Sequence, residues 1–355
     1  MTHRATDLTD RPRLCGRNRP YRCSGATLRG MRAAFITQLG SPDVIRHGEL
    51  PPPVPGPNDV LVDVEATAVN HVDGFVRSGA WRTPLEFPFV IGRDLVGTVA
   101  AVGPGAPGFR PGDRVWCNSL GHDGRQGAAA EQAVVAADRL YHLPEGADPV
   151  AAVALAHPAA TAHLALFAHG RLRAGETVAV LGAGGNVGSA IVTMAARAGA
   201  RVIAVASGRD EDYVRSLGAD EVVDYRHSDV AGRIRAAAPA GVDLHVDTSG
   251  RNDLDTAVDL LASRGRLVLL AGLRTRPVLP VGPLYLMDRS VHGFAISHAD
   301  TAQLAAAARG INGLLTSGHL RPRATEVLPL SEAADAHRRL DEGKVRGKLV
   351  LGMHR

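Results

Sequence analysis

The residues with the clearest chemical meaning form a glycine-rich stretch, LGAGGNVGSA, at residues 181–190. It holds four glycines among ten residues and directly follows the apolar run ETVAV. Glycine loses more conformational entropy on folding than any other residue, so such a cluster indicates a backbone that turns sharply or approaches a ligand closely. The two interpretations are a bare turn and a cradle for phosphate, which binds readily at the N-terminus of a helix.

The spacing of the stretch favours the cradle. Ala183, Gly185 and Gly188 have the spacing of the dinucleotide fingerprint, with alanine in the place of the first glycine. Gly185 would let the backbone reach a pyrophosphate, and Gly188 would let the following helix pack close to the preceding strand. The residues expected to form the cradle are Ala183, Gly184, Gly185, Asn186, Val187 and Gly188.

The end of the next apolar run, RVIAVA, bears on which nucleotide binds. Enzymes that use NAD normally place Asp or Glu there, whereas this chain has Ser207, Gly208 and Arg209. A hydroxyl and a guanidinium can hold a 2′-phosphate, which a carboxylate would repel. We therefore expect NADPH, although Asp210 and Glu211 follow at once and a solvated surface role for Arg209 is the alternative.

Two different sequence patterns must position these residues. Residues 31–140 alternate short β-like runs with proline and glycine, which predicts a mainly antiparallel β domain. Residues 177–294 alternate strands with helices, which predicts a doubly wound parallel sheet. One of the helices that cover this sheet is expected near residues 254–263. The terminal run GKLVLGM is expected to form a strand that pairs back into the first domain.

Length and charge set further limits. A chain of 355 residues that is 45% apolar is long enough for two domains. Residues 1–30 hold seven arginines and no apolar run, so we interpret them as a disordered extension, with a targeting sequence or a nucleic-acid arm as alternatives. The remainder is nearly neutral, and no nucleic-acid partner is expected.

Cysteines and hydropathy indicate a cytoplasmic protein. Cys15, Cys23 and Cys117 cannot supply a disulfide framework or a four-cysteine zinc site, which fits a reducing compartment. Residues 149–170 carry no formal charge, but His157 and Pro158 interrupt them, so we expect a buried helix and no membrane span.

The whole span from Met31 to Arg355 resembles the medium-chain dehydrogenase/reductase superfamily, specifically its zinc-free quinone oxidoreductase (zeta-crystallin-like) branch. The resemblance implies a GroES-like, mainly antiparallel β domain, a Rossmann doubly wound parallel sheet, a cleft between them and a homodimer. On this basis we expect an extension at 1–30, a GroES-like catalytic domain at 31–155 and 298–355, and a Rossmann domain at 156–297. The stretches that carry the resemblance are AVNHVDGFVRSGAW, PFVIGRDLVGTVAAVGPGAPGFRPGDRVW, GAAAEQAVV, HPAATAHLAL, AVLGAGGNVG, GADEVVDYR and EGKVRGKLVL.

The resemblance also assigns site residues. Zinc-dependent relatives place zinc ligands where this chain has Asn70, Arg93, Asp94 and His157, so no metal is expected. Asn70 matches an asparagine beside the nicotinamide ribose and the substrate. It could donate to a developing oxyanion, and a loop-capping amide is the alternative.

His71 and His157 are the titratable groups that the sequence places near the cleft with a pKa suited to protonating an enolate. Packed or loop histidines, with solvent as the proton source, are the alternative. Tyr225 matches a family tyrosine near the adenosine 2′-phosphate, and the backbone of Ala271 and Gly272, at the end of the fifth strand of the sheet, is expected at the nicotinamide side.

These features predict a zinc-independent reductase that transfers hydride from NADPH to a quinone or an α,β-unsaturated carbonyl compound. One alternative is an enoyl or enone reductase for polyketide or lipid-like substrates. An alternative of another class is a nucleotide-regulated binding protein whose reductase site is idle.

Overall fold

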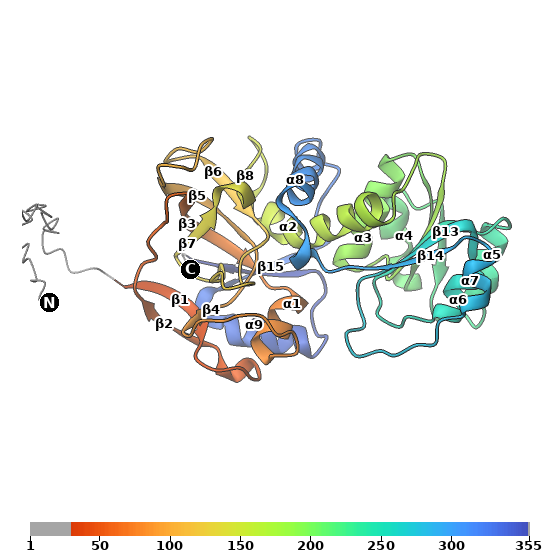
Figure 1. Cartoon of the computed structure of the whole chain (residues 1–355), viewed down its shortest axis with the longest axis horizontal. Helices are drawn as coiled ribbons and strands as arrows, with labels where there is room; N and C mark the ends of the chain where they lie inside the picture. The colour runs from red at the N-terminus through yellow and green to blue at the C-terminus, as the bar shows by residue number, and fades with distance from the viewer. Residues whose placement is uncertain (1–29, 354–355) are drawn as a thin grey trace, which may run out of the picture.

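The structure of this protein is a computed structural model that describes residues 30–353. In this range the chain forms two lobes, one built on a parallel sheet and the other on largely antiparallel sheets (Figure 1). The extension predicted at residues 1–30 lies outside the described residues except for Gly30.

The first lobe contains a six-stranded sheet whose neighbouring strands are all parallel. In spatial order its strands are β11 (Glu221–Asp224), β10 (Arg201–Ala206), β9 (Thr177–Leu181), β12 (Val242–Asp247), β13 (Leu261–Leu269) and β14 (Ser290–Gly293). Its helices are α3 (Asn186–Arg197), α4 (Glu211–Ser216), α5 (Val230–Ala237), α6 (Leu254–Asp259) and α7 (Val281–Tyr285).

Alternate residues of β9 show that both faces of this sheet are covered. Val178 and Val180 pack into the hydrophobic core that contains Ile191 of α3, whereas Ala179 packs into the core that contains Ile234 of α5. Strands that bury both faces read as continuous apolar runs, as TVAVL does. The prediction of a doubly wound parallel sheet is confirmed.

One helix boundary was predicted wrongly. The helix expected near 254–263 ends at Asp259, and Leu261 already pairs with Val242 of β12. Arg264 also adopts a φ of 62°, which lies outside the right-handed helical region. The pairing with β12 therefore overrides a local sequence that is compatible with a longer helix.

The second lobe is mainly antiparallel, as predicted. In spatial order, the strands of its larger sheet are β15 (Thr325–Pro329), β16 (Lys348–Gly352), β3 (Asp59–Ala68), β5 (Leu95–Val102), β6 (Arg114–Cys117) and β8 (Tyr141–His142). A seventh strand, β7 (Gln132–Ala136), pairs with β3 outside this order. A smaller sheet consists of β2 (Arg46–Leu50), β1 (Met31–Ile36) and β4 (Phe89–Val90).

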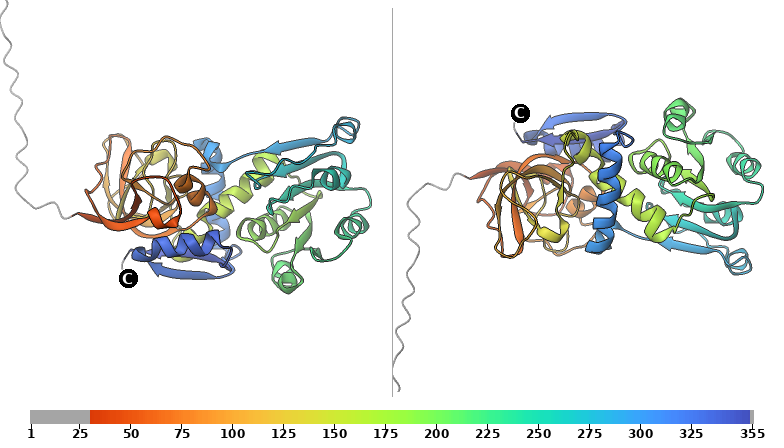
Figure 2. Two further views of the ribbon diagram at one scale, coloured as in Figure 1. Left: turned by 90° about the horizontal axis from the view of Figure 1, so that it is seen from below. Right: turned by 90° about the horizontal axis from the view of Figure 1, so that it is seen from above.

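The terminal strand β16 pairs antiparallel with β3, for example Val350 opposite Ala68. Figure 2 shows this C-terminal segment packed against the N-terminal lobe. The prediction that the terminal run returns to the first domain is therefore confirmed, and the pairing brings the two ends of the described chain into one lobe.

Helix α2 (Pro149–His163) joins the lobes and packs against α3 and α8 (Thr301–Thr316). The helical segment Pro149–His169 is long and apolar enough to cross a membrane, but 72% of its most apolar window is buried inside the molecule. Its alanines allow close helix packing, so it has the surroundings of a core helix. The domain boundary at residues 155 and 156 stays a prediction, and α2 runs across it without a break.

Two further helices belong to the second lobe, α1 (His71–Ser78) and α9 (Ala333–Asp341). They contact each other below the sheet that contains β3 and β16. Helix α1 begins directly after β3, so the end of β3 and the start of α1 face the first lobe together.

Candidate active site

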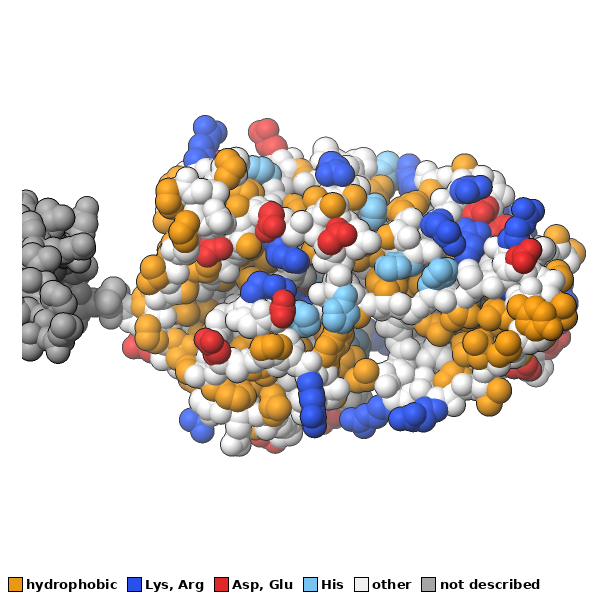
Figure 3. All heavy atoms as spheres, viewed as in Figure 1, with side chains coloured by type: hydrophobic (Ala, Val, Ile, Leu, Met, Phe, Trp, Pro, Cys, Tyr) orange, Lys and Arg blue, Asp and Glu red, His pale blue; other side chains and the backbone are white. Residues whose placement is uncertain are grey.

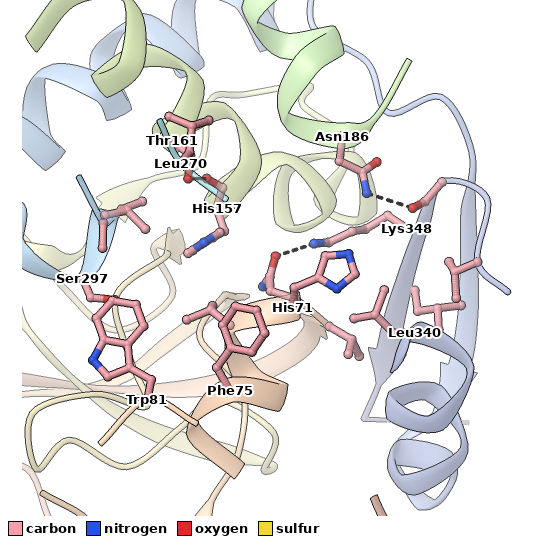
Figure 4. Close-up of a pocket in the computed structure, with 18 of the residues that line it drawn as sticks. His71, Phe75, Trp81, His157, Thr161, Asn186, Leu270, Ser297, Leu340 and Lys348 are labelled. Carbon is pink, nitrogen blue, oxygen red and sulfur yellow. Dashed lines mark hydrogen bonds between the residues drawn. The ribbon is translucent and has the colours of Figure 1, made fainter. Parts of the chain in front are cut away.

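A cavity of about 200 Å³ lies where the two lobes meet. Its walls come from α1, α2, the first residue of α3, the start of β16 and the loop after β14 (Figure 4). The three residues predicted to be catalytic, Asn70, His71 and His157, all line this cavity. Residues more than 80 positions apart in the sequence therefore meet at one site.

Asn70 is buried at the end of β3, and both ends of its amide group are occupied. Its Nδ2 donates to Asp94 Oδ2 at 2.8 Å, and its Oδ1 accepts a hydrogen bond from Lys348 Nζ. Its backbone N–H donates to Asp73 Oδ2 at 2.8 Å, which fixes the start of α1. The amide nitrogen has a second N–H donor, and its partner is the carbonyl oxygen of Ala68 at 3.5 Å, so the predicted donation from Asn70 to an oxyanion would replace that long contact.

Lys348 is the main residue of this site that the sequence analysis missed. It is 5% exposed, lines the same cavity as the histidines and extends its ammonium group toward the centre of that cavity (Figure 4). The sequence contains a signal for it, because Lys344 and Lys348 are the two lysines among 40 Lys and Arg residues. A lysine within an apolar terminal strand of an arginine-rich chain is an unusual choice.

Lys348 belongs to a buried group of four charged residues. Asp73, Arg93 and Asp94 are its other members, and each is at most 5% exposed. Arg93 forms no ion pair in the described part of the chain, and its Nε and Nη2 have no hydrogen-bond partner there. Two acids and two bases make the group neutral overall, which is the condition for burying so many charges.

Burial shifts the pKa values of this group toward the uncharged forms. It raises the pKa of Asp73 to about 6 and that of Asp94 to about 7, while the neighbouring cations act in the opposite direction. Burial also lowers the pKa of the Lys348 ammonium, and the charges of Asp94 and Asp73 partly restore it. The site therefore holds protons that can move near neutral pH.

The two predicted histidines have different surroundings. His71 begins α1 and lies beside Lys348, and burial is the main cause that lowers its pKa (Figure 4). His157 lies on α2, its Nδ1 has no partner in the described structure, and burial followed by the charge of Arg93 lowers its pKa well below the usual value. A neutral imidazole is a weak acid, so the structure disfavours His157 as a proton donor. Lys348 is a further titratable group at the cleft, beyond the two that the sequence predicts.

The glycine-rich loop connects β9 to α3 as predicted. A Cβ atom on Gly188 would lie 2.2 Å from the carbonyl oxygen of Gly182, so only glycine allows the helix to approach the strand here. A Cβ atom on Gly185 would meet only that same oxygen, at 3.3 Å, and Gly185 faces outward. Ala183 and Val187 instead point their side chains toward the core.

Asn186 connects the glycine-rich loop to the second lobe. Its Nδ2 donates to the carbonyl oxygen of Gly347 at 2.9 Å, directly before Lys348. Asn186 also lines the cavity, so the loop and the buried lysine are held next to each other.

The end of β10 has the polar groups that the sequence predicts. Ser207 is buried and its Oγ has no hydrogen-bond partner in the described structure, while Gly208 and Arg209 are exposed. Asp210, which lies against Gly184, pairs with Arg323 at 2.7 Å. This pairing reduces the repulsion that Asp210 would exert on a phosphate.

Tyr225 follows β11 at the same edge of the sheet. The guanidinium groups of Arg226 and Arg251 lie 5.7 and 6.0 Å from the centre of its ring. Asp224, however, points a carboxylate at Gly208. Cationic groups at this edge are therefore accompanied by one acidic group.

A second cavity, of about 450 Å³, opens beside Tyr225. Val205, Ile234 and Leu260 supply apolar walls, and Asp247, the last residue of β12, also lines this cavity. Its position at the carboxyl ends of parallel strands is the usual place for a nucleotide in this type of sheet.

Ala271 and Gly272 lie just beyond β13, at the same edge. Gly272 has a φ of 90°, and the carbonyl oxygen of Ala271 accepts a hydrogen bond from Asn252 Nδ2 at 3.0 Å. Leu270, one residue earlier, is the residue of this turn that lines the cavity between the lobes.

The described residues, 30–353, contain no group of three or more His, Cys, Asp or Glu side chains that could hold a metal ion. At positions where zinc-dependent relatives place zinc ligands, this chain has Asn70, Arg93 and His157. The buried guanidinium group of Arg93 would repel a cation. The chemistry of this donor set does not fit zinc.

Comparison with protein families matches both lobes. Residues 56–145 match the alcohol dehydrogenase GroES-like domain, and residues 217–351 match the zinc-binding dehydrogenase family. The matched regions include Asn70 and Asp94 in one case and Lys348 in the other.

Individual relatives cover nearly the whole chain. The mouse quinone oxidoreductase is 31% identical over 90% of this chain and 97% of its own length, and the Pseudomonas aeruginosa quinone oxidoreductase is 33% identical over 88% and 96%. A mycobacterial protein solved in complex with NADPH superposes with a TM-score of 0.80 at 31% identity, and the match covers 91% of this chain and 100% of that structure.

Proposed function

Since this chain belongs to the medium-chain dehydrogenase/reductase superfamily, in its zinc-free, zeta-crystallin-like quinone oxidoreductase branch, we propose that it transfers hydride from NADPH to a quinone or an α,β-unsaturated carbonyl compound. The observation that carries this proposal is the cavity between the lobes. It brings Asn186 of the glycine-rich loop to the same space as Asn70 and Lys348.

Several features of the first lobe fit a nicotinamide dinucleotide. Gly185 leaves the outer side of the loop open, and Ser207 offers a buried hydroxyl group without a partner. Arg209 is exposed and forms no ion pair in the described part of the chain, which supports NADPH over NADH. The complex of the mycobacterial relative with NADPH supports the same preference.

The bound cofactor would supply the hydride, and the protein would bind the acceptor and exclude water. Phe75 and Trp81 give the cavity an apolar wall suited to a planar acceptor. A volume of about 200 Å³ favours a compact quinone or enone over a long lipid-like substrate. The enoyl reductase alternative would need a longer channel.

The test of this function is a panel of quinones and enones assayed for oxidation of NADPH by its absorbance. We expect turnover with compact acceptors and slower turnover with long-chain enoyl substrates. Binding of NADPH without oxidation in the presence of any acceptor would instead support the nucleotide-regulated binding protein.

Arg209→Ala is expected to reduce the preference for NADPH over NADH by about 10- to 150-fold, because one charge-assisted hydrogen bond to the 2′-phosphate contributes about 1.5–3 kcal/mol. The measurement is the ratio of the two dissociation constants by fluorescence titration. Arg171→Ala, which removes another arginine of the same lobe away from β10, is the control. An unchanged ratio in Arg209→Ala would leave Arg209 as a surface residue.

We also propose that the protein forms a homodimer through β14. This strand is last in its sheet in the described structure, and exposed apolar side chains lie on the segment that leads into it, which includes α7. These side chains are 41–85% exposed and comprise Leu273, Val278, Val281, Tyr285, Leu286 and Met287. Figure 3 shows apolar side chains gathered on the face of the lobe that carries α6 and α7. A second copy could continue the sheet across a twofold axis and cover these residues.

Leu286→Glu is expected to weaken the dimer by about tenfold or more, since it places a charge in an apolar contact. Sedimentation velocity over a range of concentrations measures the dissociation constant. Val54→Glu, at an 88% exposed residue of the other lobe, is the matched control. A wild-type protein that is monomeric throughout would disprove this part of the proposal.

The proposal places the reaction in the cytoplasm. Cys117, the cysteine in the described residues, is free and buried, as is usual in a reducing compartment.

A further inference from the structure

We propose that Lys348 donates a hydrogen bond, and then a proton, to the carbonyl oxygen of the acceptor, and that Asn70 and Asp94 hold its ammonium group in position. This inference rests on the proposed function, because it names the group that stabilises the charge formed in that reaction. It gives Asn70 a positioning role in place of direct donation to the oxyanion.

The amide group of Asn70 forms hydrogen bonds with both Lys348 and Asp94. The amide oxygen faces Lys348 and the amide nitrogen faces Asp94, so the two partners fix the orientation of the amide group. Asn70 therefore connects the carboxylate to the ammonium in one chain of hydrogen bonds. An ammonium group has three N–H donors, and the described structure gives one of them to Asn70.

Lys348 lies at the cavity between the two lobes. Its side chain enters the cavity between His71 and Asn186, where the acceptor and the reactive part of the cofactor would meet (Figure 4). The charged and titratable groups around it are Asp73 and His71 on α1, Arg93 and Asp94 before β5, and His157 on α2. The two carboxylates keep the ammonium group charged, and burial favours loss of its proton.

The residue at position 348 is a lysine, although most basic residues of this chain are arginines. Of the 40 Lys and Arg residues of the chain, Lys344 and Lys348 are the lysines. A guanidinium group forms ion pairs but does not release its proton, whereas a buried ammonium group does so readily. A purely structural cation at this place would be satisfied by arginine, which the chain uses nearly everywhere else.

Lys348 gives up its proton as the acceptor takes up hydride. When hydride forms a C–H bond at the β-carbon of the acceptor, the electron pair of the C=C bond moves toward the carbonyl oxygen. The N–H bond of Lys348 breaks as the O–H bond of the enol forms, and a neutral amine remains. This amine takes a proton from water after the product has left, and the enol isomerises to the ketone in solution. With a quinone, the same proton completes one hydroxyl group of the hydroquinone.

The main test uses Lys348→Met, Lys348→Arg and the control Lys344→Met, which removes an exposed lysine paired with Glu342. We expect Lys348→Met to lower kcat by about 100-fold or more, as is usual for loss of a general acid. The dissociation constant for NADPH should stay within about threefold of the wild type. Lys348→Arg should not restore kcat, because it keeps the charge but cannot give up a proton.

Lys348→Met also leaves the carboxylates of Asp73 and Asp94 buried with Arg93 as the one remaining cation of the group, so it could fail to fold. The double variant Lys348→Met/Asp94→Asn removes both charges and keeps an oxygen that can accept from Asn70. We expect it to fold, to bind NADPH and to remain inactive. Recovery of wild-type kcat in this double variant would show that Lys348 serves only to balance charge, and would overturn the inference.

A binding experiment separates this inference from the proposed function. Nitrophenol, whose ionised form resembles an enolate, is titrated into the protein saturated with NADP⁺ at a pH below its own pKa. We expect the wild type and Lys344→Met to bind it as the coloured anion, and the double variant to lose this preference. Equal ionisation in all proteins would overturn the inference, whereas failure of the wild type to reduce any acceptor would overturn only the proposed function.

Discussion

Gly185→Val is expected to abolish binding of NADPH while the protein remains folded. The backbone of Gly185 has φ −82° and ψ 172°, which valine adopts without strain, and the position faces outward at the start of α3. Its branched side chain would fill the space through which a pyrophosphate reaches the N–H groups of the helix. We expect the dissociation constant to rise by about 100-fold or more, since a charge-assisted contact with several N–H groups is lost.

Fluorescence titration with NADPH measures this effect, and circular dichroism with thermal unfolding checks the fold. Gly313→Val is the matched control, because a Cβ atom at Gly313 on α8 meets no atom within 4 Å. It should bind NADPH as the wild type does. Wild-type affinity in Gly185→Val would show that the loop is a bare turn and would remove the basis of the cofactor assignment.

Arg266→Met is expected to lower the free energy of unfolding by about 3–5 kcal/mol, the usual effect of removing one partner of a buried ion pair. The side chain of Arg266 is 10% exposed, and its guanidinium group pairs with Glu176 at 2.7 Å. Its remaining N–H groups donate to the carbonyl oxygens of Gly170, Arg171 and Asp243. These hydrogen bonds therefore connect β12 and β13 to the turn that leads from α2 into β9.

Urea unfolding of Arg266→Met and the wild type gives the difference in free energy. Arg110→Met is the control, because Arg110 is 86% exposed and its ion pair with Asp113 is expected to contribute about 0–1 kcal/mol. Equal losses in the two variants would show that the hydrogen bonds of Arg266 contribute little to stability. Arg266 pairs with Leu244 near the amino-terminal end of β12, whereas the glycine-rich loop follows the carboxyl end of β9. Nucleotide binding by the folded variant should therefore persist.

The glycine-rich loop shows how much a local pattern can predict. The strand, the loop and the helix are contiguous in the sequence, so Gly185 and Gly188 could be assigned from spacing alone. The structure then gives the reason for Gly188, whose replacement would bring a Cβ atom to 2.2 Å from a backbone oxygen. The helix predicted near 254–263 illustrates the opposite case, because pairing with a distant strand ends it at Asp259.

By itself, the sequence determined the parallel sheet and the mainly antiparallel domain, the glycine-rich loop and the place of Asn70, His71 and His157 near one cleft, because these follow from periodicity, contiguous motifs and family resemblance. Only the tertiary structure decided that Lys348 lies against Asn70, 278 residues away in the chain, and that both amide ends of Asn70 are occupied. The pairing of β16 with β3 creates this contact, and burial then sets the proton affinities of the group. Both effects depend on which surfaces exclude water together, and no stretch of sequence contains that information locally.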